Sequence, residues 1–368
     1  MSEFIKKIIF YGILILGMII LANLGCGMVL KILKKKDLLV KQAYFAALPN
    51  FKDNPEDFKK IYDDYYKSVA EYVPFVEWHR KQIQTPTLNV DSLGYRIHAF
   101  DPKKINANSL KVYFFGGSTM WGTGVDDNHT IPALFNQLNP TFEVHNAGET
   151  GFNSRQSLEA LINILTEGKK VDIAVFYEGF NDINKNYFRK NPYHAHAQDM
   201  LFLDRTSNRI RLIERLFYGN IKALFEFLNE DNLIESYNIY DKDCGNHQTQ
   251  ELAQESIKIW ELAKNMVEKQ GGKFILIVQP TAVTGNPNIS HLKDIIKKSD
   301  YEGGIGKGYR CIFPIFQDFC TKQENRNWAF DFTHIFDGKT YYFYDVVHVS
   351  ANGNQKVAVA IDSLLKTK

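Results

Sequence analysis

Ser118 is the residue in this sequence that is best placed for covalent chemistry. It follows the apolar run 111–115 and two glycines, a pattern typical of a buried strand that ends in a tight turn. A serine there is exposed at the carboxyl edge of a sheet, beside backbone N–H groups that can stabilise a developing negative charge. The same stretch also fits an ordinary turn or a phosphate-binding loop. Whether Ser118 is a nucleophile therefore depends on whether other residues of the chain supply a base and oxyanion donors.

Acyl transfer through a serine needs a base, a group that orients the base, and donors for the oxyanion. Asp345 and His348 lie three residues apart before a predicted helix, so the carboxylate can hold one imidazole nitrogen and leave the other for Ser118. Gly151 could offer its N–H from a loop, and Asn181 could offer its side-chain amide after a predicted strand. Taken singly, these residues also fit a surface pair, a turn glycine and a helix cap.

The elements that must position these residues alternate between strand and helix after residue 110. The predicted strands are 111–115, 142–145, 171–177, 273–279 and 328–336, and the predicted helices are 131–138, 154–165, 251–269 and 350–366. This alternation indicates a parallel sheet covered on both faces. Insertions at about 186–250 and 281–327 follow strand carboxyl ends, where ligand sites gather. They are candidate substrate-binding or lid segments, or simply additional packing.

The four chemical segments occur in the order of four blocks known from one superfamily. They are Gly-Gly-Ser118, Asn146-Ala-Gly-Glu-Thr-Gly151, Gly179-Phe-Asn181-Asp182 and Asp345-Val-Val-His348. With them, the chain from about 110 to 366 resembles the SGNH (GDSL-type) serine hydrolases. One residue departs from the pattern: Gly117 stands where the superfamily usually has Asp, which places the geometry of the nucleophile loop in question.

The resemblance implies an α/β fold of the flavodoxin-like kind, with a parallel sheet in a three-layer α/β/α arrangement. It also implies a catalytic triad of Ser118, His348 and Asp345, and an oxyanion hole from the N–H groups of Ser118 and Gly151 and the side chain of Asn181. No cofactor and no metal are expected. His194 and His196 lie in the first insertion and could bind substrate or metal, but two histidines are a weak signal.

A run of 23 residues without charge, 8–30, precedes this domain and has lysines on both sides. About 20 apolar residues span a bilayer as a helix, and no small-residue cleavage site follows the run. We therefore predict an N-terminal transmembrane anchor over 1–36, a mixed linker or packing region over 37–109, and a hydrolase-like domain over 110–368. The larger number of lysines after the run favours a cytoplasmic domain, although long domains can translocate regardless of such a bias.

The mixed region and the cysteines give weaker indications. Residues 53–71 have helical spacing of apolar residues, and residues 87–100 fit a short strand with a turn. Arg96 and His98 could face a site, but a role as surface or hydrogen-bonded loop residues is the simpler interpretation. Cys311 and Cys320 could pair, although their separation alone cannot show it.

These patterns together predict a membrane-anchored serine esterase or O-acyltransferase. The net charge of +2 argues against a nucleic-acid binder. Tethered members of the superfamily suggest an acetylated cell-surface glycan as substrate and an extracytoplasmic domain, against the flanking lysines; this step is analogy. One alternative is a lipase or thioesterase acting on lipid acyl chains. Another is an inactive protein that binds a glycan or serves as a scaffold.

Overall fold

The computed structural model describes residues 2–99, 102–186, 216–228, 244, 247–298 and 304–366. The chain divides into two compact units, of which one comprises residues 1–44 and 196–240 and the other residues 45–195 and 241–368. The second unit holds every residue of the predicted catalytic site. It also takes in most of the region 37–109.

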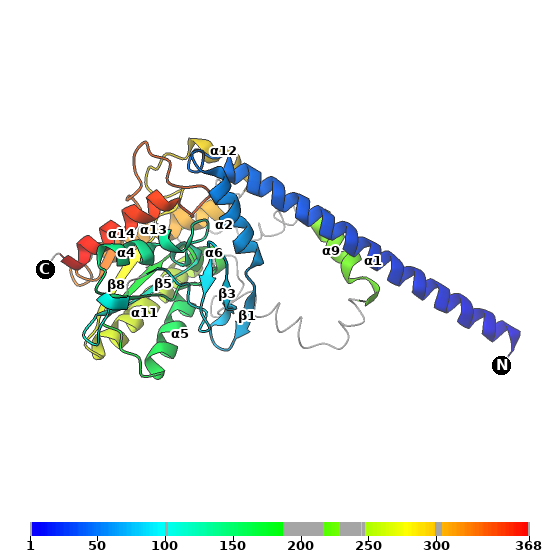
Figure 1. The fold of residues 1–368 in the computed structure, drawn as a ribbon, viewed down its shortest axis with the longest axis horizontal. Coiled ribbons are helices and arrows are strands. Elements are labelled where there is room, and N and C mark those ends of the chain that lie inside the picture. The colour runs from blue at the N-terminus through cyan, green and yellow to red at the C-terminus, as the bar shows by residue number, and fades with distance from the viewer. Residues whose placement is uncertain are drawn as a thin grey trace. The chain divides into compact units, whose positions relative to one another are not determined.

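The second unit is built on a five-stranded parallel sheet (Figure 1). Its strands are β5 (Lys111–Gly116), β6 (Glu143–Asn146), β7 (Ile173–Glu178), β8 (Lys273–Val278) and β9 (Ala329–Asp331). Their spatial order is β6-β5-β7-β8-β9, which is the 2-1-3-4-5 order of flavodoxin-like folds. The predicted fold class is therefore confirmed, and the point where the strand order reverses lies between β5 and β7.

Helices cover both faces of this sheet (Figure 1). They are α4 (Ile131–Leu138), α5 (Ser154–Thr166), α11 (His247–Lys269), α13 (Gly304–Thr321) and α14 (Ala351–Lys366). Helix α4 packs against α14 on one face, while α11 packs against both α5 and α13 on the other. The central strands are apolar because they are buried on both sides, and rings such as Phe115 and Phe176 pack across them with centroids 4.8 Å apart.

One predicted strand needs correction in this unit, and the structure answers the question about the cysteines that the sequence left open. The strand predicted at 328–336 pairs only over Ala329–Asp331, because the Asp331 carboxylate accepts a hydrogen bond from the Thr333 N–H and turns the chain. Cys311 does not pair with Cys320: it forms a disulfide with Cys244, and Cys320 is free and buried. Cys311 and Cys320 share one helix, where nine residues separate their Cα atoms by about 13 Å, beyond the reach of a disulfide.

The region before the sheet forms helix α2 (Pro55–Lys67), a hairpin of β1 (Ala70–Val73) and β2 (Glu77–Arg80), and the short pair β3 (Ile83–Gln84) and β4 (Asn89–Val90). The helix predicted at 53–71 thus forms and ends four residues early. Its Phe58 is buried, and the ring centroids of Phe58 and Tyr344 lie 6.0 Å apart. Tyr344 directly precedes Asp345, the predicted triad carboxylate. Residues 45–109 thus belong to the same compact unit as the sheet.

The first unit contains helix α1 (Glu3–Ala46) and helix α9 (Gly219–Leu228). Helix α1 is long and apolar enough to cross a membrane, and only 11% of its most apolar window is buried. A core helix of a soluble protein would be mostly buried, whereas the apolar window of α1 is mostly exposed, as expected for a helix that crosses a membrane.

Candidate active site

Ser118 is the first residue of the short helix α3 (Ser118–Trp121), directly after β5. Two glycines make this turn. Gly116 has a φ of +151°, which side chains rarely adopt, and a Cβ there would come within 2.7 Å of the Tyr177 carbonyl oxygen. The turn thus brings Ser118, the predicted nucleophile, to the carboxyl edge of the sheet at the point where the strand order reverses.

His348 connects Ser118 to Asp345 through two hydrogen bonds. Its Nε2 lies 2.7 Å from the Ser118 Oγ, and its Nδ1 lies 2.6 Å from the Asp345 Oδ2. The second carboxylate oxygen accepts the backbone N–H groups of Val347 and His348 at 2.9 and 2.7 Å. The structure therefore brings the three predicted triad residues together in the order nucleophile, base and orienting acid.

The Asp345 carboxylate is held in its charged form. Burial alone would raise the pKa of its carboxyl, but the neighbouring His348 imidazole and the hydrogen bonds from the loop outweigh burial and lower that pKa. The ring of Tyr344 stacks on the imidazole with centroids 5.8 Å apart, and the Tyr344 hydroxyl donates to the Thr123 carbonyl. The imidazole is thus fixed by a carboxylate on its edge and a ring on its face.

Asn181 lies beside the nucleophile turn. Its Nδ2 donates one hydrogen bond to the Phe152 carbonyl at 2.7 Å, which leaves the second amide hydrogen for a ligand. Gly117 packs directly against the same Nδ2. The amide is therefore next to the residue that precedes Ser118.

Asp182 fixes the segment that carries Asn181. Its carboxylate accepts the N–H and hydroxyl of Ser154 at 3.0 and 2.9 Å and the N–H of Gly179 at 3.1 Å. These bonds join the end of β7 to the first turn of α5. In the sequence, Asp182 is recognisable only as a member of the third motif; in the structure its carboxylate joins the third motif segment to the helix that follows the second.

Gly151, the third predicted oxyanion donor, has a φ of +83°, and its loop is held by residues that sequence analysis missed. The Thr150 carbonyl accepts from the Trp78 indole at 3.1 Å, and its hydroxyl accepts from the Arg80 Nη2 at 3.0 Å. The Thr150 N–H donates to the Glu149 carboxylate at 2.6 Å.

Glu149 completes this clamp from within the loop. Its carboxylate is buried and also accepts the backbone N–H of Arg80 at 2.7 Å. The Arg80 guanidinium in turn lies over the ring of Trp121, the last residue of α3, at 5.4 Å. The β1–β2 hairpin therefore contacts both the nucleophile helix and the loop before Gly151. The contacts of this hairpin could not be predicted from the spacing of residues in the sequence, because the hairpin lies outside the four blocks.

The other predicted polar residues have structural partners. Arg96 is buried, pairs with Asp127 at 2.8 Å and donates to the Val125 carbonyl at 2.7 Å, so it fixes the loop after α3. His98 is within hydrogen-bond distance of Asn136, at 3.3 Å. The simpler interpretation of these two residues therefore holds. Within the described residues, no group of three metal ligands occurs, and His194 and His196 lie outside those residues.

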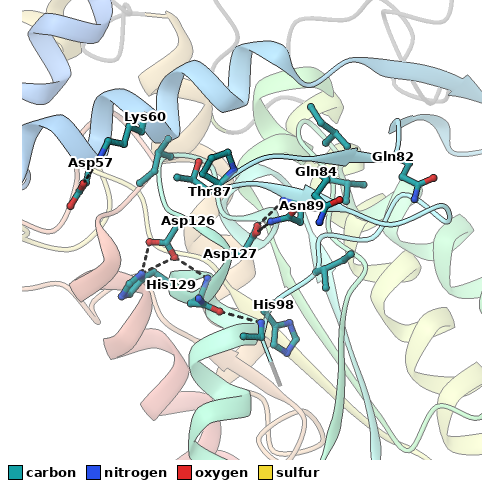
Figure 2. Close-up of a pocket in the computed structure, with 17 residues that line it drawn as sticks. Asp57, Lys60, Gln82, Gln84, Thr87, Asn89, His98, Asp126, Asp127 and His129 are labelled. Carbon is teal, nitrogen blue, oxygen red and sulfur yellow. Dashed lines mark hydrogen bonds and ion pairs between the residues drawn. The ribbon is translucent and has the colours of Figure 1, made fainter. Parts of the chain in front are cut away.

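A separate hollow of about 860 Å³ lies between α2, the β3–β4 pair and residues 126–129 (Figure 2). Neither Ser118 nor His348 lines it. Its charged side chains have partners: Lys60 donates to Asp57 at 3.3 Å, the His129 ring bonds Asp126 at 2.8 Å, and Asp127 accepts from the Arg96 guanidinium at 2.8 Å. This hollow therefore offers amide and hydroxyl groups rather than a net charge.

No protein-family model and no curated protein matches the sequence. Several solved structures are similar in fold. One is a member of the lipolytic protein G-D-S-L family from Veillonella parvula, at 12% identity and a TM-score of 0.40, covering 71% of this chain and 100% of that one. Another is the acetyl xylan esterase AlAXEase, at 16% identity and a TM-score of 0.36, covering 69% and 98%. At such TM-scores, the likeness carries no argument about activity.

Proposed function

We propose that this chain is a serine ester hydrolase of the SGNH type, with Ser118 as nucleophile, His348 as base and Asp345 as its orienting acid. The observation that carries the proposal is the continuous set of hydrogen bonds from the Ser118 hydroxyl through the imidazole to the Asp345 carboxylate, whose pKa is lowered. An inactive binding protein has no need for this arrangement, so the intact triad counts against that alternative.

In the proposed mechanism, His348 takes the proton of the Ser118 hydroxyl as the oxygen attacks an ester carbonyl. The charge that develops on the imidazole is stabilised by Asp345. The oxyanion of the tetrahedral intermediate accepts from the N–H groups of Ser118 and Gly151 and from the free amide hydrogen of Asn181. His348 then returns the proton to the departing alkoxide, and water or another hydroxyl releases the acyl group.

The decisive experiment uses a fluorophosphonate probe and a short p-nitrophenyl ester. We expect the wild-type protein to be labelled and to turn over the ester, and both signals to disappear in Ser118→Ala. Ser363→Ala is a matched control, since that serine is exposed on α14 and its hydroxyl donates to the Val359 carbonyl of the same helix. A folded wild-type protein that shows neither labelling nor turnover would exclude the hydrolase and favour the binding alternative.

For the substrate, we propose an acylated, in particular acetylated, glycan outside the cytoplasm, with α1 as the membrane anchor. The Cys244–Cys311 disulfide supports that side of the membrane, because disulfides persist in oxidising compartments, whereas the lysines after the apolar run argue for the other side. A lipid acyl chain is the competing substrate. Rates with acetyl and long-chain esters separate the two, and a reporter fused after Lys368 shows the side of the membrane.

A further inference from the structure

Asn23 is a polar residue within the apolar run of α1, yet it is only 2% exposed. Its Oδ1 accepts the backbone N–H groups of Asn220 and Ile221 at 2.8 and 3.3 Å, and its Nδ2 donates to the Leu216 carbonyl at 3.1 Å. One side chain thus satisfies three backbone groups at the beginning of helix α9.

Gly27, one turn further along α1, allows the close approach. A Cβ at this position would stand 2.8 Å from the Asn220 side-chain nitrogen, whereas a Cβ at Gly12 would meet nothing within 4 Å. Helix α9 therefore begins against one defined part of α1 (Figure 1). Small residues that let two helices approach are common where helices pack inside membranes.

The depth of this contact follows from the sequence. Asn23 precedes Leu30, the end of the charge-free run, by seven residues, which is about 10 Å along a helix. If α1 spans the bilayer, the start of α9 lies at the same depth, where no water satisfies backbone groups and a partner must do so. The three hydrogen bonds of Asn23 supply that partner, and polar residues within membrane spans usually serve such a function.

The remaining surface of α9 suits lipid. Its large side chains Ile221, Phe225 and Leu228 are exposed, the last two by 69% and 65%. Helical spacing places these three on one face, while Lys222 and Glu226 pair at 4.0 Å on another edge. A helix with an apolar face and a charged edge lies in the boundary between acyl chains and headgroups, with its apolar face about 5–10 Å deep.

We propose that α9 is a second membrane-inserted element, an interfacial helix that is seated on the anchor α1 by Asn23 and Gly27 and that places Ile221, Phe225 and Leu228 among lipid acyl chains. The proposal rests on the anchor proposed above but not on the hydrolase chemistry. Its consequence is that the long insertion after Asn181 returns to the bilayer, so the protein is attached to its membrane at two points in the sequence.

Photolabelling from within the bilayer tests this. The full-length protein is reconstituted into phosphatidylcholine and phosphatidylglycerol vesicles with a phospholipid that carries a diazirine near the end of an acyl chain, and labelled peptides are mapped by mass spectrometry. We expect label on 216–228 and on the exposed positions of α1, with Asn23 protected. If α1 is labelled and residues 216–228 are not, the proposal for α9 is wrong and the anchor stands. If neither segment is labelled, the proposed anchor is wrong as well.

Two variants test whether α9 packs against α1 at Asn23 and Gly27. Gly27→Phe, whose ring is too large to be accommodated by a rotation of the Asn220 side chain alone, should push α9 away and expose Asn23 to the label, while Gly12→Phe, which adds the same side chain in open space, should leave the protection unchanged. Equal protection of Asn23 in wild type and Gly27→Phe would show that α9 is not seated there. Ser118 labelling by the fluorophosphonate is recorded in parallel, so a loss of the hydrolase is distinguished from a loss of the seat.

Discussion

A side chain at residue 117 and the amide of Asn181 would occupy the same space, because a Cβ on Gly117 would overlap the Asn181 Nδ2. The φ of Gly117 is an ordinary −81°, so the constraint is steric and not conformational. The superfamily's usual Asp could not stand there without moving Asn181. The glycine that replaces the superfamily's usual Asp at residue 117 therefore leaves room for the Asn181 amide, the predicted oxyanion donor.

Gly117→Ala should displace the Asn181 amide and lower kcat about 10²–10³-fold, the usual cost of losing one oxyanion donor. Asn181→Ala should lower it to a similar extent. Because both changes remove the same interaction, the double variant should be no worse than either single variant. Ester hydrolysis rates of the four proteins, with circular dichroism to check folding, provide the test. Full activity in Gly117→Ala would show that Asn181 does not act from its present position.

Arg80→Met should lower kcat about 10- to 100-fold with little change in KM, because a small misplacement of the Gly151 N–H weakens transition-state binding. Methionine has a side chain of similar length but lacks the guanidinium, which lies over the rings of Tyr65 and Trp121 and donates to Thr150. The matched control is Arg155→Met, which removes an exposed arginine that donates to Glu159 on its own helix. Faster amide exchange over residues 147–153 in the Arg80 variant alone would locate the effect in that loop, and unchanged exchange and activity would contradict it.

Glu178→Gln should stabilise the protein at neutral pH but not in acid. Burial first, and then the charge of Asp182, raise the pKa of the Glu178 carboxyl well above 4.5. The folded state therefore keeps a proton that the unfolded state releases, and the free energy of unfolding falls as pH rises above 4.5. Glutamine can still accept from Ser157 and removes this loss. Urea unfolding should show equal stability near pH 4 and an advantage of about 1 kcal/mol or more for the variant near pH 8; an advantage that did not change with pH would count against a protonated Glu178.

Replacing both Cys244 and Cys311 by serine should lower the free energy of unfolding by about 2–4 kcal/mol, because the disulfide limits the unfolded chain. Reduction of the wild-type protein should have the same effect, whereas the double variant should not respond to a reducing agent. Cys26→Ser, which touches no disulfide, serves as the control. Denaturant midpoints that are insensitive to reduction in the wild type would show that the bond does not form.

The sequence predicted the parts of this fold that local patterns determine. The strand before Ser118 and the helices 131–138 and 154–165 agree with the structure to within a residue, because apolar runs and caps such as Thr130 and Asn153 mark their ends. Helix α13 was not predicted within the insertion 281–327. Three glycines in its first five positions and an internal Pro314 hide a helix that packs on α11.

Long-range contacts were beyond the reach of spacing arguments. The triad could be proposed because each member stands in a recognisable block. The clamp formed by Trp78, Arg80 and Glu149 could not, because its hairpin meets Thr150 across about 70 residues of sequence and follows no pattern. Likewise, the partner of Cys311 depended on which segments meet in space.

The pairing of Asp345 with His348 has a consequence for the biosynthesis of the protein. The base and its acid come from one short loop, in which two backbone N–H groups hold the carboxylate, whereas Ser118 was added to the chain 230 residues earlier. A nascent polypeptide therefore displays its serine without a proton acceptor until that late loop has left the ribosome and docked. If the proposed function is correct, the newly synthesised protein is inactive and gains hydrolytic activity only when the loop with Asp345 and His348 packs against Ser118.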